Sequence, residues 1–196
     1  MPPFKQIKMF AEFLNIIVRS LKLDKTLYKE NKYFEHEAGI YFAISIIILT
    51  ALVGLIPHKA ILNFFSPYVG ELEPPRLLMV VIGSGIAWLL RSLYLFLVVL
   101  ILFPNNKIKK IFIKTLIAVG FAHAPFLFNL LILDFKLIYL TFVIYIWYNA
   151  TLVVGINQIY QFNNILKSTI IVIAPYLIFV IYILYLMSNN PNGTIS

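Results

Sequence analysis

A group of polar side chains stands inside stretches of sequence that are otherwise apolar, and these residues could do chemistry. They are Ser84, Arg91, His123, Asn129, Asn149 and Gln158. Ser84, Trp88 and Arg91 follow one another at helical spacing, so they share one face of a helix. A serine with a histidine can act as nucleophile and base, whereas arginine with side-chain amides suits an anionic group.

An intramembrane serine hydrolase is the first of the functions that these polar residues could serve. Proteases of the rhomboid kind place their serine in a Gly-x-Ser-Gly setting with a histidine on another helix, and the stretch from Val81 to Gly85 misses that pattern. Ser84 with His123 stays open as a dyad. The chain has no cysteine, and its apolar stretches hold no aspartate pair and no His-Glu-x-x-His sequence. We therefore expect no metal and no cofactor.

A small transporter or lipid-binding permease is the second alternative, with a polar cavity lined by Arg91, His123, Asn129 and Asn149. Proton-coupled transporters normally need carboxylates buried at mid-depth, and the apolar stretches contain none. An arginine at the bilayer centre costs roughly 2.5–3.5 kcal/mol on insertion scales and usually faces the bundle interior. Arg91 is expected to bind an anionic group or to bond backbone carbonyls while reaching toward one interface, and we favour the carbonyls.

The composition of the chain indicates that the candidate polar residues lie on helices within a membrane. Hydrophobic residues make up 61% of the 196 positions and charged residues 12%, against about 25% charged residues in soluble domains. The formal net charge is +8, and its basic residues flank the apolar stretches. Anionic lipid headgroups, rather than nucleic acid, are therefore the expected partners. The sequence predicts an all-α membrane protein.

Five stretches are long enough to cross a hydrocarbon core of about 30 Å, which takes about 20 helical residues. Short connections follow the third and the fourth, so neighbouring spans there are antiparallel. We predict a bundle of five transmembrane helices over residues 38–187, between a cytoplasmic segment at 1–37 and an external polar tail at 188–196. The predicted spans are 38–56, 77–103, 111–133, 137–159 and 165–187.

Lysine and arginine residues fall mainly on one side of these spans. Twelve lie in the N-terminal segment, around the second connection and after the fourth span, while Lys59, Arg76 and Lys136 lie on the other side. Because positive flanks resist translocation, the N-terminus is predicted to be cytoplasmic and the C-terminus outside. A glycosylation sequon at 192–194 would then be accessible in a eukaryotic cell. The expected location is the cell membrane of a prokaryote, with the Golgi or endoplasmic reticulum membrane as the alternative.

The N-terminal residues 4–23 carry an amphipathic helical pattern. This pattern predicts a helix lying in the plane of the cytoplasmic membrane interface. A helix that packs on the cytoplasmic loops is the alternative. The apolar arc holds Phe10, Phe13, Leu14, Ile17, Val18 and Leu21, and the polar arc holds Lys5, Lys8, Glu12, Asn15, Arg19 and Lys22.

The stretch GFAHAPFLFNLL, residues 120–131, concentrates unusual residues in the third span. Pro125 has no N–H and is expected to kink the helix, while Gly120 lets another helix approach closely. His123 is expected to donate a ring N–H to a carbonyl, and Asn129 to make an interhelical hydrogen bond. We expect packing, not catalysis, for His123, and a kink that seats this span against the fourth. The fourth span offers a polar stripe of Trp147, Thr151, Val154 and Gln158.

The order of these features resembles the Ypt-interacting protein (Yip) domain family of membrane proteins. The resemblance covers most of the chain: a short amphipathic N-terminal segment, five spans and a brief outside tail. Gly120, Phe121 and Pro125 fall at the glycine, aromatic and proline positions of the family's motif. A tryptophan at the centre of the next span, here Trp147, and a lysine opening the last helix, here Lys167, follow in the family's order.

This resemblance implies a non-enzymatic role in membrane organisation or trafficking, as a scaffold or partner-binding component that self-associates. In eukaryotic members the role involves Rab-type small GTPases and partner Yip proteins. This chain lacks their extended cytoplasmic N-terminal region and their Asp-Leu-Tyr-Gly-Pro element, to which the stretch 66–70 is the nearest match. The chain thus resembles a short bacterial or archaeal member, in which the link to a GTPase stays open.

Overall fold

The computed structural model describes residues 3–34, 37–65, 74–103, 108–132, 137 and 139–189. Within these ranges the chain is helical and contains no strand. The stretch 66–70, Lys136 and the sequon at 192–194 lie outside the described residues. In chain order the elements are α1 (Pro3–Leu21), the 3-10 helix η1 (Leu27–Lys29), α2 (Asn31–Phe34), α3 (Glu37–Phe65), α4 (Pro74–Leu102), α5 (Ile108–Ala122), the 3-10 helix η2 (Ala124–Leu131), α6 (Tyr139–Ile159) and α7 (Ile165–Asn189).

Five helical segments are long and apolar enough to cross a membrane. This finding confirms the predicted all-helical, five-span class, and the chain is a multi-pass integral membrane protein. The segments lie close to the predicted spans, although α3 continues well past residue 56 to Phe65. They are Glu37–Leu55, Leu78–Leu102, Ile111–Leu131, Tyr139–Ile159 and Ile165–Leu186.

The third span is built from two kinds of helix instead of one kinked α-helix. The α-helix α5 ends at Ala122, and η2 carries the chain on to Leu131 as a 3-10 helix. Pro125 stands in the first turn of η2, where its missing N–H costs least. Because a 3-10 helix rises about 2.0 Å per residue instead of 1.5 Å, these few residues reach further across the membrane.

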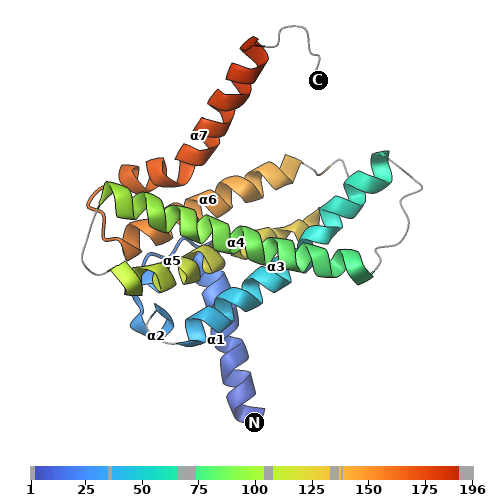
Figure 1. Ribbon diagram of the computed structural model, residues 1–196. Coiled ribbons are helices and arrows are strands. Elements are labelled where there is room, and N and C mark those ends of the chain that lie inside the picture. Colours follow the sequence, from blue (N-terminus) through green and yellow to red (C-terminus); the bar gives the residue numbers. More distant parts are fainter. Residues whose placement is uncertain are drawn as a thin grey trace.

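The packed centre of the bundle is formed by α3, α5 with η2, and α6. Among its fully buried side chains are Ile46 of α3, Ile117 and Phe121 of α5, and Leu152 of α6. The helix α4 covers α3 and α5, while α7 packs against α6 and α4. Figure 1 shows the distal half of α7 pointing away from the other helices, and the N-terminal half of α1 projecting in a different direction.

The short helix α2 and the start of α3 form a tight elbow beside α5. A Cβ atom at Gly39 would lie 1.7 Å from the main-chain oxygen of Tyr33, so this position accepts only glycine. The rings of Tyr33 and Phe34 meet the ring of Phe121 edge-on, with centroids 6.3 and 5.8 Å away. The elbow therefore fixes the approach of the N-terminal segment to the bundle.

The helix α1 divides its apolar surface between two neighbours. Ile16 and Ile17 are buried against the bundle, and the indole Nε1 of Trp147 donates a 3.0 Å hydrogen bond to the carbonyl oxygen of Leu21. A second stripe stays exposed, and we call it the α1 outer stripe. It comprises Ile7, Phe10, Leu14 and Val18, which are 45–69% exposed. Part of the predicted apolar arc thus holds α1 to the protein, and the outer stripe has no neighbour among the described residues that covers it.

Candidate functional site

His123 lies where α5 gives way to η2, and its ring completes the end of the helix. The N–H of His123 bonds the carbonyl of Gly120 at 3.1 Å, three residues back. An α-helix would instead direct it to the carbonyl of Val119. The Nδ1 atom of His123 lies 2.6 Å from that carbonyl oxygen. Because a carbonyl can only accept, Nδ1 carries the proton. The histidine thus replaces a main-chain donor lost at the helix transition.

The remaining surface of the His123 ring packs against aromatic rings. The ring centroid of Tyr148 lies 4.9 Å away and that of Phe126 lies 5.7 Å away. Ser84 lies on α4, and within the described part of the chain no hydrogen bond joins Ser84 to His123. A nucleophile and its base need such contact, at about 2.6–3.2 Å. The geometry therefore favours packing over catalysis for this histidine.

The glycine of the same stretch faces the first span, not the fourth as expected. A Cβ atom on Gly120 would lie 2.4 Å from Cβ and 3.0 Å from Cα of Ala43 in α3. Contact with the fourth span begins at His123, which packs on Tyr148, and continues to Phe128, whose ring stacks on that of Trp147 with centroids 5.2 Å apart. Pro125, which lies between Gly120 and Phe128 in the sequence, is buried. The stretch therefore seats the third span against both the first and the fourth.

Arg91 is the centre of a polar cluster where α4, α6 and α7 meet. Its Nη2 atom donates to the carbonyl oxygen of Val172 at 3.1 Å and to Oδ1 of Asn149 at 3.4 Å. Its guanidinium carbon lies 4.9 Å from the centroid of the Tyr176 ring, which adds a cation–π contact. The Nε atom has no hydrogen-bond partner among the described residues. As expected, Arg91 bonds a backbone carbonyl.

Two tyrosines that the sequence did not single out complete this cluster, which we call the Arg91 cluster. The hydroxyl of Tyr145 donates to that of Tyr176 at 2.8 Å, and Tyr176 donates to Oδ1 of Asn149 at 3.2 Å. Pro175 inside α7 is the signal that could have revealed them. Pro175 has no N–H to donate to the carbonyl of Ile171, the residue before Val172, so it marks an interruption of the helix beside the carbonyl that Arg91 bonds. The cluster comprises Arg91, Tyr145, Asn149, Val172 and Tyr176.

Both tryptophans tie helices together through their indole N–H groups. Trp88 of α4 donates to the carbonyl oxygen of Leu116 in α5 at 2.9 Å, and Trp147 of α6 donates to Leu21 in α1. Thr151, one turn after Trp147, bonds the carbonyl of Trp147 at 3.0 Å and is fully buried. Within the predicted polar stripe of α6, Trp147 therefore joins α6 to α1, while Thr151 bonds within α6.

The other predicted site residues lie apart from the Arg91 cluster. Asn129 is buried in η2, and its Oδ1 has no partner among the described residues. Gln158 lies near the end of α6, and Lys167 near the start of α7 places its Nζ 5.2 Å from the ring centroid of Phe103. Of the six polar residues, hydrogen bonding joins only Arg91 and Asn149 in the described structure. The sequence could not show which spans are adjacent.

A charged clamp fastens the segment after α1. Arg19 pairs with Asp24 through Nε at 2.7 Å and with Glu30 through Nη1. The hydroxyl of Thr26 donates to Asp24 at 2.7 Å. Hydrogen bonds from Thr26 and Arg19 lower the pKa of Asp24 to about 2. Leu23 turns the chain with a φ of 54°, and this residue type carries some strain there. The clamp holds the turn that connects α1 to η1.

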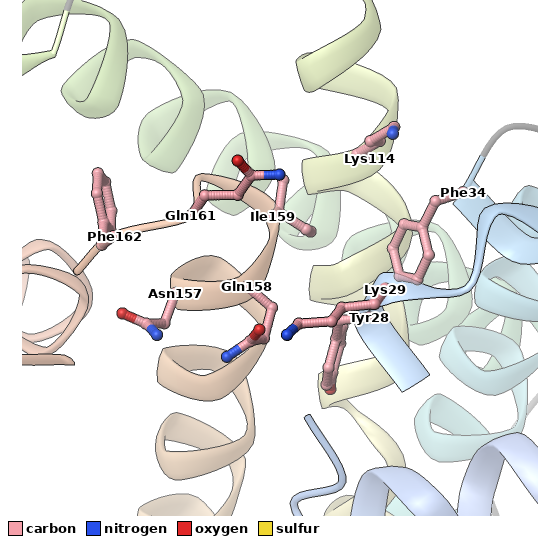
Figure 2. A pocket seen from close by; sticks show the side chains of 9 residues that line it. All are labelled: Tyr28, Lys29, Phe34, Lys114, Asn157, Gln158, Ile159, Gln161 and Phe162. Atoms are coloured by element: carbon pink, nitrogen blue, oxygen red, sulfur yellow. The ribbon is translucent and has the colours of Figure 1, made fainter. Parts of the chain in front are cut away.

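A cavity of about 460 Å³ lies where η1 and α2 meet the start of α5 and the end of α6. Two lysines, Lys29 and Lys114, line it together with the side-chain amides of Asn157, Gln158 and Gln161. Figure 2 shows Lys29 reaching toward Gln158, while Lys114 extends from α5 on another side. None of Arg91, His123, Asn129 and Asn149 contributes to its wall. We call it the basic cavity.

The described residues contain no group of three or more histidine, cysteine, aspartate or glutamate side chains that could hold a metal ion. A search against models of known protein families found no match to the chain. Searches of curated proteins and of solved structures also found no match. The resemblance to the Yip family therefore stays a prediction that rests on the motif residues and their order.

Proposed function

We propose that this multi-pass membrane protein is a non-enzymatic scaffold that organises membranes by binding other membrane proteins, with a second copy of itself as the first partner. This role is the one that the resemblance to the Yip family implies. A Rab-type GTPase as partner belongs to eukaryotic relatives and stays open for this chain. We further propose that the N-terminus is cytoplasmic, that the C-terminus is outside and that the chain resides in a prokaryotic cell membrane.

The observation that carries the proposal is the exposure of α7. In the apolar part of α7 only 12% of the residues are buried inside the protein, against 50% for the spans in α3 and in α5 with η2. From Leu177 to Leu186 the described side chains are all exposed, and Figure 1 shows this half of α7 pointing away from the other helices. Ile178, Ile181, Tyr182 and Tyr185 recur at helical spacing and are 55–65% exposed. We call them the α7 face, and we propose that it pairs with the same face of a second copy.

A symmetric pair suits this surface. In a twofold dimer the same patch serves both partners, so one exposed helix face is sufficient. In lipid, the association of helices depends on close contacts and on hydrogen bonds, and not on the hydrophobic effect. The α7 face offers apolar side chains for close contact and two tyrosine hydroxyl groups for hydrogen bonds. Its exposure therefore supports helix pairing in the membrane.

The polar side chains of the bundle support a structural role as well. His123 bonds the Val119 carbonyl, Trp88 bonds the Leu116 carbonyl and Arg91 bonds the Val172 carbonyl. Each of these donors therefore satisfies a main-chain carbonyl of the bundle. The transporter alternative, with a cavity around Arg91, His123 and Asn149, receives less support because the basic cavity is lined by other residues.

Disulfide crosslinking in native membranes tests the proposal cleanly because the chain has no cysteine of its own. In an Ile181→Cys variant, mild oxidation should yield a covalent dimer, since the two copies of this position approach each other across the pair. Ile146→Cys is the matched control. Ile146 lies on α6 and is 70% exposed, against 65% for Ile181, so it reports random collisions of lipid-facing residues.

Three results are informative. A dimer from Ile181→Cys that greatly exceeds the dimer from Ile146→Cys supports pairing through the α7 face. A Tyr182→Leu change in the Ile181→Cys background should reduce dimer yield if hydroxyl contacts contribute. Equal yields at the two positions would show that α7 meets only lipid, and the scaffold proposal would lose its main support.

A further inference from the structure

The basic cavity combines positive charge with hydrogen-bond donors at one end of the bundle. Lys29 is exposed at its mouth, and Lys114 is partly buried on α5. Its wall includes no aspartate or glutamate from the described residues. The acid next to Lys29, Glu30, pairs with Arg19 in the clamp. The described part of the wall thus carries two lysines and no carboxylate, which favours an anionic ligand.

The polar groups on the α6 side can donate hydrogen bonds. Oδ1 of Asn157 accepts a 3.1 Å hydrogen bond from the hydroxyl of Ser168, which leaves the amide NH₂ group to donate elsewhere. The main-chain oxygens of Asn157 and Gln158 accept from Phe162 and Gln161 at 3.1 and 3.4 Å. These bonds close the C-terminus of α6 as in a Schellman motif. The helix end thus presents few free acceptors that would repel an anion.

The walls of the cavity also include aromatic rings. Phe34 comes from α2 and Phe162 from the connection between α6 and α7, and Figure 2 shows them on opposite sides of the cavity. Its volume of about 460 Å³ falls within the range of about 300–1,000 Å³ that is usual for small-ligand sites. An anionic head with an apolar tail therefore fits this combination of walls better than an isolated ion.

We propose that the basic cavity binds a phosphate monoester. A monoester carries nearly two negative charges and three acceptor oxygens at neutral pH, which match two ammonium groups and several amide donors. Lysine binds phosphate as a point charge and needs no fixed planar geometry. Basic pockets between membrane helices on the cytoplasmic side bind anionic lipid headgroups. The predicted orientation places this cavity on that side, so the ligand is the headgroup of a lipid or a free phosphate compound of the same chemistry.

Native mass spectrometry of the full chain released from lipid nanodiscs tests the proposal. Phosphatidic acid supplies a monoester headgroup, and phosphatidylserine supplies a diester headgroup with a carboxylate. We expect the protein to retain phosphatidic acid preferentially. Lys29→Gln should reduce retention about fivefold, and Lys29→Gln with Lys114→Gln about 25-fold. Each lysine near an anionic surface contributes about 1 kcal/mol, which corresponds to a factor of about five in affinity.

The matched control is Lys22→Gln with Lys25→Gln. It removes the same total charge from exposed positions outside the cavity wall and should change retention less than about twofold. Because Lys29 is exposed, the single Lys29→Gln variant should keep its fold and remain informative even where Lys114→Gln lowers the yield. Thermal unfolding of each variant in lipid-free detergent checks this point.

A separate titration distinguishes a lipid headgroup from a free phosphate compound as the source of the phosphate. Inorganic phosphate and glycerol 3-phosphate are added to the protein in phosphatidylcholine nanodiscs, and binding is measured by calorimetry. Binding of the soluble compounds that depends on Lys29 assigns the cavity to a free phosphate compound. Retention of phosphatidic acid alone assigns it to a headgroup. Equal retention of the two lipids, with the cavity variants matching the control variants and no binding of soluble phosphate, would overturn the proposal.

Discussion

Replacing Gly120 with alanine adds one methyl group at the closest approach of the first and third spans. The new Cβ atom would lie 2.4 Å from Cβ and 3.0 Å from Cα of Ala43. Carbon atoms in contact prefer about 3.5–4.0 Å. The opposing atoms are the main chain and the Cβ atom of Ala43. Because alanine has no side-chain torsion angle that could move Cβ away, the clash cannot be relieved by a change of rotamer. The two helices must separate by on the order of 1 Å.

The expected cost follows from two opposing effects. Overpacking of a dense core costs typically about 1–3 kcal/mol, and the rigid neighbour places this site near the upper figure. Alanine gains up to about 1 kcal/mol over glycine within a helix. We therefore expect Gly120→Ala to lower the free energy of unfolding by about 2 kcal/mol. Gly120→Leu should prevent folding.

Equilibrium unfolding in mixed detergent micelles measures this change by tryptophan fluorescence. Trp88 reports directly on the helix concerned because it bonds Leu116 of α5. Gly83→Ala is the matched control: a Cβ atom at Gly83 meets nothing within 4 Å. The control variant should be unchanged or more stable by up to about 1 kcal/mol. The two alanine variants should therefore differ by about 3 kcal/mol.

The double variant with Ala43→Gly separates steric clash from other effects. Removing Cβ of Ala43 takes away the 2.4 Å contact and leaves the Cα atom at 3.0 Å. A double-mutant cycle should return a favourable coupling of at least about 1 kcal/mol. If Gly120→Ala is as stable as Gly83→Ala, or if Ala43→Gly gives no rescue, the close approach of these spans is not as described.

Three further predictions concern the helix transition, the clamp and the outer stripe. His123→Ala should lower stability by about 1–2 kcal/mol, since it leaves the Val119 carbonyl without a partner; His123→Phe keeps the ring contacts and should lower it less, as thermal unfolding can measure, and equal losses would assign the effect to the hydrogen bond alone. The protection of residues 22–30 against hydrogen exchange, relative to the intrinsic rate at each pH, should fall as pH falls from about 4 toward the Asp24 pKa of about 2. The reason is that a lowered carboxyl pKa stabilises the fold only above that range, and Asp24→Asn should remove this pH dependence. Phe10→Ser with Leu14→Ser should reduce quenching of probes on α1 by lipid-attached quenchers without releasing its buried face, and unchanged quenching would place the outer stripe away from lipid.

The number and positions of the apolar helices were predictable because membrane insertion depends on local composition. A stretch of about 20 apolar residues must be helical in lipid, since no water is present to bond its main chain. The predicted limits of the fourth and fifth spans, 137–159 and 165–187, therefore lie close to α6 and to α7. The amphipathic pattern of residues 4–23 likewise matches the helix α1.

The interior contacts were less predictable because they depend on which faces meet. The sequence suggested that Gly120 admits a close neighbour, but it could not show that the neighbour is Ala43. It also indicated the donor role of His123 without indicating the change to a 3-10 helix that leaves the Val119 carbonyl without its main-chain donor. That change depends on Pro125 together with the packing of η2 against α3 and α6.

The Arg91 cluster illustrates the same limit. Arg91 and Asn149 were singled out because charge and amide groups are rare in lipid. Tyr145 and Tyr176 were not, since tyrosine is common in membrane helices. Their contribution depends on α7 meeting α4 and α6 at its first turns. The basic cavity was hidden in a similar way, because Lys29, Lys114 and Gln158 are far apart in the chain and no pattern in the sequence shows that they meet.

The crossing of the membrane by α7 is the central claim, since the proposed pairing face lies on its distal half. Single cysteines in the cysteine-free chain make this crossing measurable with a membrane-impermeant maleimide on intact cells. Ser188→Cys stands at the far end of α7, and Lys25→Cys stands in the clamp segment. Our account predicts that Ser188→Cys is labelled in intact cells and that Lys25→Cys is labelled only after permeabilisation. Labelling of both positions under the same condition would place them on one side and contradict the account.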